Sequence, residues 1–224
     1  MIKAVNLTKV FRTESVETTA LNGINLEINQ GEFVAVMGPS GCGKSTLLNL
    51  LGLLDNPTSG ELWFLEEEVS RYTENNRTDL RNGNLGFVFQ SFNLIDELTV
   101  FENVELPLLY AGVPVKERVA RVNAALDRMQ NAHRTEHYPP QLTGGQQQRV
   151  AIARAIVTNP KIILADEPTV NLVSVNGNEV MNLLLELNKE CSTVVMVTHS
   201  EENARMAGRL IRMMDGNILT ESRK

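Results

Sequence analysis

The chain has 224 residues, of which 42% are hydrophobic, a composition that supports a substantial core and excludes a disordered chain. Its net charge is -6, and no run of Lys or Arg forms a patch that would follow a nucleic-acid backbone, so we expect no nucleic-acid partner. No apolar stretch approaches the roughly 18 residues of a membrane span, and no signal-peptide pattern opens the sequence. The two cysteines, Cys42 and Cys191, lie far apart, which predicts free thiols in the cytoplasm.

Three strand-like stretches open the chain, at residues 2–11, 21–28 and 33–37. We expect them to form an antiparallel set that leads directly into a glycine-rich loop. This loop fits the pattern G-x-x-x-x-G-K-[ST] without a mismatch, and a helix-like stretch follows at residues 45–54. The loop and its continuation consist of Gly38, Pro39, Ser40, Gly41, Cys42, Gly43, Lys44, Ser45 and Thr46.

The loop predicts a site for the phosphates of a nucleotide. Its glycines let backbone amides turn inward around phosphate oxygens, and the helix that follows adds the positive end of its dipole. Lys44 can reach the outer phosphates as a point charge, and the Ser45 hydroxyl can ligate Mg²⁺. The alternative is a glycine-rich turn without function, and the strand before the loop and the helix after it argue against it.

The middle of the chain changes from strand to helix. A turn signal at residues 57–60 precedes a short strand at 61–65, and another strand at 84–89 ends at Gln90. From about residue 91 to residue 159 the pattern is helical, with amphipathic spacing at 115–129 and 146–157. We therefore expect one domain over 1–224, in which a catalytic core (1–90 and 160–224) carries a helical subdomain (91–159).

Two apolar runs near the end of the chain, at 162–165 and 194–197, are linked by a helical stretch at 176–189. This pattern predicts parallel strands covered on both faces, and such sheets bind ligands outside the carboxyl ends of their strands. Four polar residues follow predicted strands at such ends: Gln90, Asp166, Glu167 and His199.

These four residues suit phosphoryl chemistry. Asp166 would hold Mg²⁺, through water, and Gln90 would complete the shell of the metal or of the attacking water. Glu167 would polarise that water, and His199 would donate a hydrogen bond to the terminal phosphate. Taken singly, each is also an ordinary polar residue at the start of a solvated loop. Their shared position at strand ends favours the functional interpretation.

A second glycine-led element begins the predicted helix at 146–157, and it provides another anion-binding helix N-terminus. Its residues are Thr143, Gly144, Gly145 and Gln146, after Leu142. The full ordered set of motifs resembles the ATP-binding subunits of ABC transporters, and the resemblance covers essentially the whole chain. It implies an α/β P-loop NTPase fold with a RecA-like parallel-sheet core, an antiparallel β subdomain and a helical insertion, with ATP and Mg²⁺ as ligands.

The resemblance also implies how the parts act. In that family two subunits face each other head to tail, and the glycine signature of one closes over ATP held by the other, so a homodimer or a heterodimer with another ABC ATPase is expected. An aromatic residue of the first strand would stack on adenine, which is Phe11 here. The alternative for Phe11 is an ordinary core position.

The finer resemblance is to the lipoprotein-release and macrolide-export group, with the cell-division ATPase close by. It rests on residues 19–22, 47–57 and 89–94 and on Glu102-Asn103-Val104. It implies an ATP-hydrolysing subunit on the cytoplasmic face of the inner membrane that drives an integral membrane permease for lipoprotein, lipophilic or peptide cargo. Residues 90–107 would form the groove for the permease, although their apolar residues also suit ordinary helix packing.

Three positions depart from the family pattern. Thr143 replaces the signature serine and keeps its hydroxyl. Val170 stands where the family usually has Gly, and Val173 stands where it usually has Asp. A valine at 170 resists the positive φ that glycine adopts, and a valine at 173 has no hydrogen-bonding group, so both predict reduced turnover.

These departures keep two alternatives open. One is a nucleotide-gated signalling module of the cell-division type that hydrolyses ATP weakly. The other, the least favoured, is a nucleic-acid-processing ABC ATPase, because coiled-coil or zinc modules typical of that class are absent from the sequence.

Overall fold

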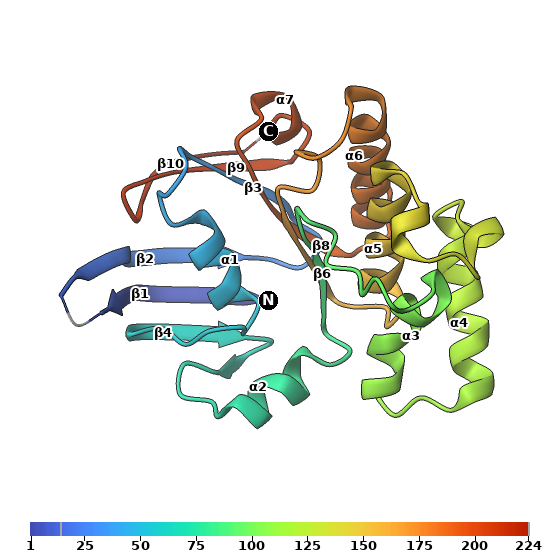
Figure 1. Ribbon diagram of the computed structural model, residues 1–224. Helices are drawn as coiled ribbons and strands as arrows, with labels where there is room; N and C mark the ends of the chain where they lie inside the picture. The colour runs from blue at the N-terminus through green and yellow to red at the C-terminus, as the bar shows by residue number, and fades with distance from the viewer. Residues whose placement is uncertain (14, 224) are drawn as a thin grey trace. The chain divides into compact units, whose positions relative to one another are not determined.

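The computed structural model describes residues 1–13 and 15–223, and the chain divides into two compact units (Figure 1). Unit 1 contains Met1–Arg81 and Asn188–Lys224, and unit 2 contains Asn82–Leu187. None of the helices in the described part of the chain has the length and apolar character that crossing a bilayer requires.

Unit 1 contains a four-stranded antiparallel sheet in the order β2-β1-β4-β5 (Figure 1). Its strands are β1 (Ile2–Arg12), β2 (Glu17–Ile28), β4 (Ser59–Phe64) and β5 (Glu67–Glu68). Along the second half of β2, the apolar residues Leu21, Ile24, Leu26 and Ile28 are buried while most of the residues between them face solvent. This alternation is typical of an antiparallel sheet with one covered face.

The other strands of unit 1 form a mostly parallel group. Strand β3 (Phe33–Met37) lies between β8 (Thr193–Thr198) and β9 (Arg209–Met214) and runs parallel to both, while β10 (Asn217–Arg223) is antiparallel to β9. The prediction that residues 33–37 belong to the antiparallel set was therefore wrong. Every residue of β3 is buried, which is the pattern of a strand covered on both faces and not that of an alternating strand.

Three helices complete unit 1. Helix α1 (Lys44–Leu51) follows β3 and packs against β8, α2 (Glu74–Arg81) precedes the boundary with unit 2, and α7 (Glu201–Ala204) follows β8. The side chains that α1 buries include Leu47, Leu48, Leu50 and Leu51. This apolar face holds the beginning of α1 in a fixed position after the glycine-rich loop.

Unit 2 is built of helices and a pair of strands. Helices α3 (Val100–Tyr110), α4 (Val115–Arg128) and α5 (Gly144–Ile156) pack on one another, and α5 also packs on β6 (Leu85–Val88). Strand β6 runs parallel to β7 (Ile162–Asp166), and α6 (Ser174–Lys189) follows. Short 3₁₀ turns at Ala132–Arg134 and Pro139–Gln141 connect α4 to α5.

The close approach of α5 to β6 depends on a residue without a side chain. A Cβ atom at Gly86 would lie 2.3 Å from the carbonyl oxygen of Ala155. Only glycine therefore allows the strand and the helix to pack at this distance.

Most predicted elements of unit 2 lie within two residues of their observed bounds. The exception is the beginning of the helical region, which was predicted near residue 91 and is found at Val100. In the intervening stretch Phe92 and Asn93 both have positive φ values, of 60° and 50°, which an α-helix excludes. The predictions also missed five short or terminal elements, namely α2, β5, α7, β9 and β10.

Candidate functional site

The glycine-rich loop of unit 1 runs from the end of β3 to the beginning of α1 and can be formed only with glycines at two positions. Gly43 has a φ of 100°, and a Cβ atom there would lie 2.4 Å from the carbonyl oxygen of Ala20. At Gly38 a Cβ atom would lie 2.3 Å from the carbonyl oxygen of Met213. The loop is therefore packed tightly against neighbouring backbone, which fixes the direction of its amide groups.

Helix α1 begins at this loop with an open N-terminus. Its N-cap is Gly43, which has no side-chain acceptor for the first amides, and its first turn contains no acidic residue. No capping side chain and no acidic residue of the first turn therefore competes with an anionic ligand for the positive end of the helix dipole.

Lys44 occupies the centre of the loop. Its ammonium group donates hydrogen bonds to the carbonyl oxygens of Gly38, at 2.9 Å, and Pro39, at 2.8 Å. The side chain is buried, with 8% of the residue's surface exposed, and its Nζ lies 4.0 Å from Sγ of Cys42. A buried ammonium held by carbonyl oxygens can exchange them for phosphate oxygens, which are stronger acceptors because they carry charge.

The remaining predicted residues of the loop are more accessible. Ser40, Gly41 and Ser45 are exposed, and Ser45 lies in the first turn of α1. The Ser45 hydroxyl could therefore serve as an oxygen ligand for a metal ion that enters together with a nucleotide.

His199 lies at the same edge of the strands as the glycine-rich loop. Strands β3 and β8 are parallel, with Met37 opposite Thr198, so the loop and His199 both begin directly after that pair. His199 is exposed, and Ser200 caps the short helix that follows by accepting a hydrogen bond from the amide of Asn203. The structure thus places His199 where sequence reasoning predicted, at a strand end beside the loop.

Phe11 lies near the end of β1 and is 45% exposed. The ammonium group of Lys9 lies over its ring, 5.1 Å from the centroid, and also donates to Asp55 at 2.7 Å. The exposed ring is therefore not a core position, which removes the alternative interpretation of Phe11. An accessible aromatic face can stack on a flat base.

In unit 2 the structure brings Gln90, Asp166 and Glu167 to one edge. Strands β6 and β7 are parallel with Val88 opposite Ala165, so the residues that follow each strand begin side by side. Asp166 and Glu167 are half-buried, and Glu167 has a positive φ of 46°. Such a conformation in a non-glycine residue is uncommon and is concentrated at functional sites.

The second glycine-led element begins α5 with a reciprocal cap. Thr143 is the N-cap, and its hydroxyl accepts from the amide of Gln146, while the Gln146 side chain accepts from the amide of Thr143 at 3.0 Å. A Cβ atom at Gly145 would lie 2.8 Å from the side chain of Asn176, so this position also requires a small residue. Threonine in place of serine keeps the cap intact.

Val170 and Val173, which depart from the family pattern, are both at the surface. Val170 is not among the residues with positive φ, so the expected backbone strain at this position does not occur. Val173 is 70% exposed and carries no polar group. The departure from the family pattern that bears on turnover is therefore the hydrogen bond that Val173 cannot form, and not the backbone conformation at Val170.

Sequence reasoning did not single out two residues that hold the segment after Gln90. Asn171 donates from Nδ2 to the carbonyl oxygen of Gln90 at 3.0 Å, and Arg154 of α5 donates to the carbonyl oxygens of Phe92 and Asn93. Their side chains bind backbone, and no sequence pattern indicates which backbone a distant side chain will reach.

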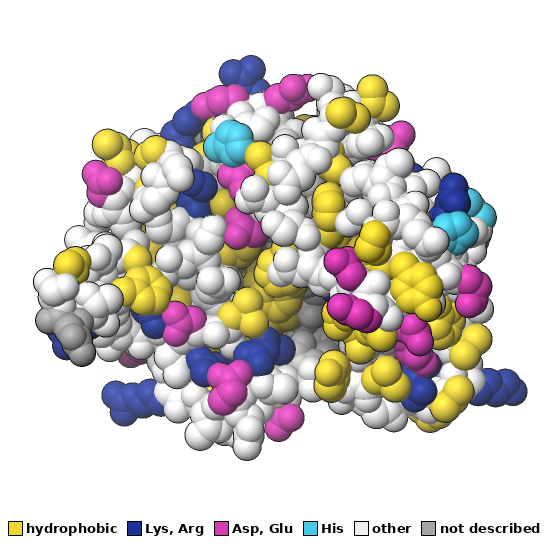
Figure 2. Space-filling model, in the orientation of Figure 1, with side chains coloured by type: hydrophobic (Ala, Val, Ile, Leu, Met, Phe, Trp, Pro, Cys, Tyr) yellow, Lys and Arg dark blue, Asp and Glu magenta, His cyan; other side chains and the backbone are white. Residues whose placement is uncertain are grey.

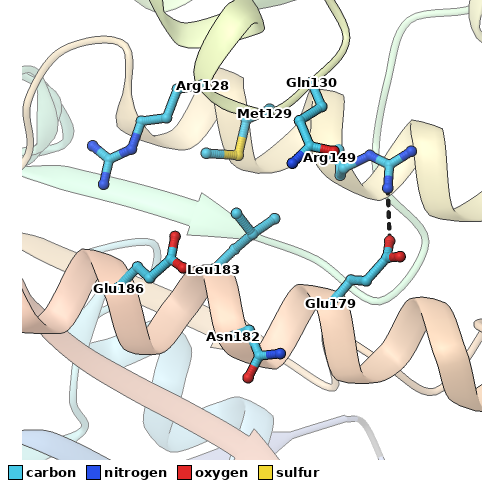
Figure 3. A pocket seen from close by; sticks show the side chains of 8 residues that line it. All are labelled: Arg128, Met129, Gln130, Arg149, Glu179, Asn182, Leu183 and Glu186. Carbon is cyan, nitrogen blue, oxygen red and sulfur yellow. Dashed lines mark hydrogen bonds and ion pairs between the residues drawn. The ribbon is translucent and has the colours of Figure 1, made fainter.

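A cavity of about 230 Å³ lies among α4, α5 and α6 in unit 2 (Figure 3). It is lined by both signs of charge, including Arg128, Arg149, Glu179 and Glu186, and Arg149 forms an ion pair with Glu179 at 2.8 Å. This mixture of charges favours no single class of ligand. Among the described residues, no group of three or more His, Cys, Asp or Glu side chains could hold a metal ion by itself.

The sequence is similar to a known family and to known proteins. The family model described as ABC transporter matches residues 21–170. An uncharacterized ABC transporter ATP-binding protein of Methanocaldococcus jannaschii is 49% identical over 98% of this chain and 98% of its own length. The macrolide export ATP-binding/permease protein MacB of an Azoarcus species is 47% identical over 99% of this chain, which corresponds to 34% of that longer protein.

Solved structures give the same result. The ATP-binding cassette MJ0796, described as a dimer in a post-hydrolysis state bound to ADP and Pi, matches with a TM-score of 0.93 and 45% sequence identity. The match covers 100% of this chain and 98% of that one.

Proposed function

We propose, from the premise that this chain belongs to the ABC transporter family of ATP-binding proteins, that it dimerises on ATP, hydrolyses it and thereby drives a membrane permease. The observation that carries the proposal is the glycine-rich loop of unit 1. There Gly38 and Gly43 allow close backbone packing, and the buried ammonium of Lys44 is held at the centre. This is a cradle for a chain of phosphates.

The nucleotide would bind along unit 1. Phe11 would stack on adenine, and the residues from Gly38 to Thr46 would surround the phosphates. Mg²⁺, held with the nucleotide by Ser45, Gln90 and Asp166, would neutralise phosphate charge and orient the terminal phosphate for attack. The oxygen-rich donor set and the open N-terminus of α1 fit such a metal–nucleotide pair.

Hydrolysis would then depend on two side chains that follow buried strands. Glu167, which has a positive φ, would accept a proton or a hydrogen bond from the attacking water. His199 would donate a hydrogen bond to the terminal phosphate as negative charge redistributes there.

The second glycine-led element would act across a dimer. Thr143, Gly144, Gly145 and Gln146 would close over the nucleotide held by another subunit, since the first amides of α5 face no acidic residue in the first helical turn. The dimeric state of the related cassette MJ0796 supports this arrangement. The partner would be a second copy or another ABC ATPase.

A surface of unit 2 suits contact with a permease. Large apolar side chains are exposed on α3, on α4 and before α3, and hydrophobic side chains gather over these helices in Figure 2. They are Ile95, Leu109, Tyr110, Val115 and Val119, with exposed fractions of 40% to 76%. Exposed apolar patches of this kind mark sites of protein contact. From the family resemblance we propose the groove for the permease at residues 90–107, which include the exposed Ile95, and a helical subdomain at 91–159 that also carries the other four exposed residues.

The cargo and the location are proposed by analogy with the relatives. The match to a macrolide export protein supports a role in export. Lipoprotein, lipophilic or peptide cargo, and a place on the cytoplasmic face of the inner membrane, are what the family resemblance implies. A second candidate function is a signalling module that binds ATP and hydrolyses it weakly. The observation that favours it is Val173, which offers no hydrogen bond at a position where the family usually has aspartate.

The test is hydrolysis of Mg-ATP as a function of protein concentration, in the parent chain and in Glu167→Gln. We expect the rate per subunit to rise with concentration and to fall at least about 100-fold in the variant, since it lacks its general base. Sedimentation should show that Glu167→Gln accumulates as an ATP-bound dimer.

Glu136→Gln, at an exposed position of the same unit, is the matched control and should behave as the parent. Normal hydrolysis in Glu167→Gln, without an ATP-dependent dimer, would overturn the proposal. Tight ATP binding with no turnover by the parent at any concentration would support the signalling module instead.

A further inference from the structure

The segment that follows Gln90 has a backbone conformation that must be held by its surroundings. Phe92 and Asn93 lie in succession in the left-handed region, with φ values of 60° and 50°. Asparagine tolerates this region, but the side chain of phenylalanine can form no hydrogen bond that would offset the contact between its Cβ and the backbone. Short turn bonds, from the amide of Asn93 to the carbonyl of Ser91 and from Phe92 to Phe89, close the segment on itself.

The segment is held from one side by helix α5. The guanidinium of Arg154 donates to the carbonyl oxygen of Phe92 at 2.8 Å and to that of Asn93. In the described part of the chain these carbonyls, and no carboxylate, are its partners. Burial lowers the pKa of Arg154. Two bonds from one planar cation fix both the separation and the orientation of the two carbonyls.

The segment is held from the other side by the turn that carries the carboxylates. Asn171, five residues after Asp166, donates from Nδ2 to the carbonyl oxygen of Gln90 at 3.0 Å. The same region packs at the beginning of α5, because a Cβ atom at Gly144 would contact both the Asn171 carbonyl and the Phe92 ring at 3.7 Å. The backbone of Gln90 is thus tied to the turn after β7, and the residues after it are tied to α5.

We propose that Arg154 and Asn171 are positioning residues that fix the path of the chain from Gln90 to Asn93 and so the direction of the Gln90 side chain. The inference rests on the proposed function only in so far as Gln90 contributes to hydrolysis. Neither residue touches the reacting atoms. Each acts through a backbone carbonyl, and therefore through the conformation of the segment.

The first test is hydrogen exchange of the segment 89–95, measured by mass spectrometry on the full chain. We expect Arg154→Ala to speed exchange there by about tenfold or more, since two charge-assisted hydrogen bonds are lost. Asn171→Ala should have a smaller effect in the same segment. Arg149→Ala is the matched control, because it removes another arginine of α5 whose ion pair with Glu179 lies outside the segment.

The second test is steady-state hydrolysis. Arg154→Ala should lower kcat by about tenfold while the KM for ATP changes less than twofold, because the phosphate loop belongs to unit 1. Arg154→Lys, which keeps the charge and one of the bonds, should recover part of kcat and part of the protection from exchange. A residue that served stability alone would lower the apparent kcat only in proportion to the folded fraction, so kcat is calculated per folded molecule, with the folded fraction measured by circular dichroism at the assay temperature.

The outcomes separate this inference from the proposed function. Unchanged exchange of residues 89–95 in Arg154→Ala would overturn the positioning role and leave the proposed function as it stands. Faster exchange with unchanged kcat would overturn the link from the segment to hydrolysis. Full activity of Gln90→Ala would overturn the role of Gln90 in hydrolysis. The effect of Arg154→Ala on exchange would still stand.

Discussion

Val173 occupies the position from which helix α6 begins, and replacing it by aspartate tests the structure directly. Its carbonyl oxygen accepts a hydrogen bond from the amide of Gly177 at 3.0 Å, which is the first bond of the helix and identifies Val173 as the N-cap. Valine offers no side-chain acceptor to the first amides of α6, and the first turn contains no acidic residue. We predict that Val173→Asp stabilises the protein.

The magnitude follows from three contributions. An aspartate cap in place of a residue without an acceptor is worth about 1 kcal/mol, and its charge near the helix N-terminus adds roughly 0.3 to 1 kcal/mol. Because Val173 is 70% exposed, the loss of its remaining burial costs about 0.5 to 1 kcal/mol. The net gain is about 1 kcal/mol, which for a chain of this size raises the Tm by about 2 to 4 °C.

Thermal unfolding of three variants separates the contributions. Val173→Asn keeps the cap without the charge and should give a smaller gain than Val173→Asp. Val173→Ala has neither and should be no more stable than the parent. Added salt should bring the aspartate variant towards the asparagine variant, because it screens the charge. A Tm for Val173→Asp at or below that of Val173→Ala would refute the N-cap assignment.

The same variants test whether Val173 limits turnover. A charged interfacial hydrogen bond formed in the transition state is worth about 1.5 to 3 kcal/mol, which corresponds to a rise in rate of roughly tenfold to a hundredfold. Val173→Asn should gain stability with a smaller rise in rate. A stabilised Val173→Asp with an unchanged rate of hydrolysis would show that the valine is not a brake.

Three further predictions concern other parts of the site and its support. Gly43→Ala should abolish ATP binding, measured by calorimetry, and cost at least about 1 to 3 kcal/mol of stability in urea unfolding. Its φ is 100°, and the added Cβ would lie 2.4 Å from a backbone carbonyl oxygen of β2. Thr143→Ala should destabilise the protein by about 1 kcal/mol in the same assay while Thr143→Ser stays near the parent, since only alanine removes the cap of α5. Burial acts to raise the pKa of Glu32, but hydrogen bonds from Asn29 and Arg209 outweigh it and lower that pKa. The ionised Glu32 therefore stabilises the protein at neutral pH, and this contribution is lost as the pH falls through the lowered pKa. Glu32→Gln should therefore unfold more easily than the parent near neutral pH, and a difference that does not shrink on acidification would contradict the assignment.

The local parts of the site could be predicted from sequence because their residues determine their own conformation. The pattern from Gly38 to Ser45 predicts a loop between a strand and a helix, and the structure has that loop, with φ values that Gly41 and Gly43 supply. The apolar runs at 162–165 and 194–197 likewise predict buried strands. A strand with one face in water would have a polar residue at about every second position, and these runs do not. The positions of His199 and Glu167 then follow from where those strands end.

The parts that were missed depend on contacts between distant residues. Strand β3 was assigned to the wrong sheet because a short apolar run does not indicate its partners, which come from residues 193–198 and 209–214. The left-handed residues Phe92 and Asn93 were predicted as helix because their conformation depends on Arg154, some sixty residues later in the chain. A propensity for helix is a weak preference that such bonds readily override.

Helix α5 explains why these distant contacts matter for function. It begins at Thr143 with the element that would cover the nucleotide of another subunit, and it carries Arg154 near its other end. Arg154 lies eleven positions after Thr143, about 16 Å along the axis at about 1.5 Å per residue. Because the helix packs against α3, α4 and β6, we expect it to move as one body and not by bending. Any movement of its N-terminus on dimerisation would therefore shift the guanidinium that holds the segment after Gln90, and Arg154→Ala should uncouple the exchange rate of that segment from ATP-dependent dimer formation.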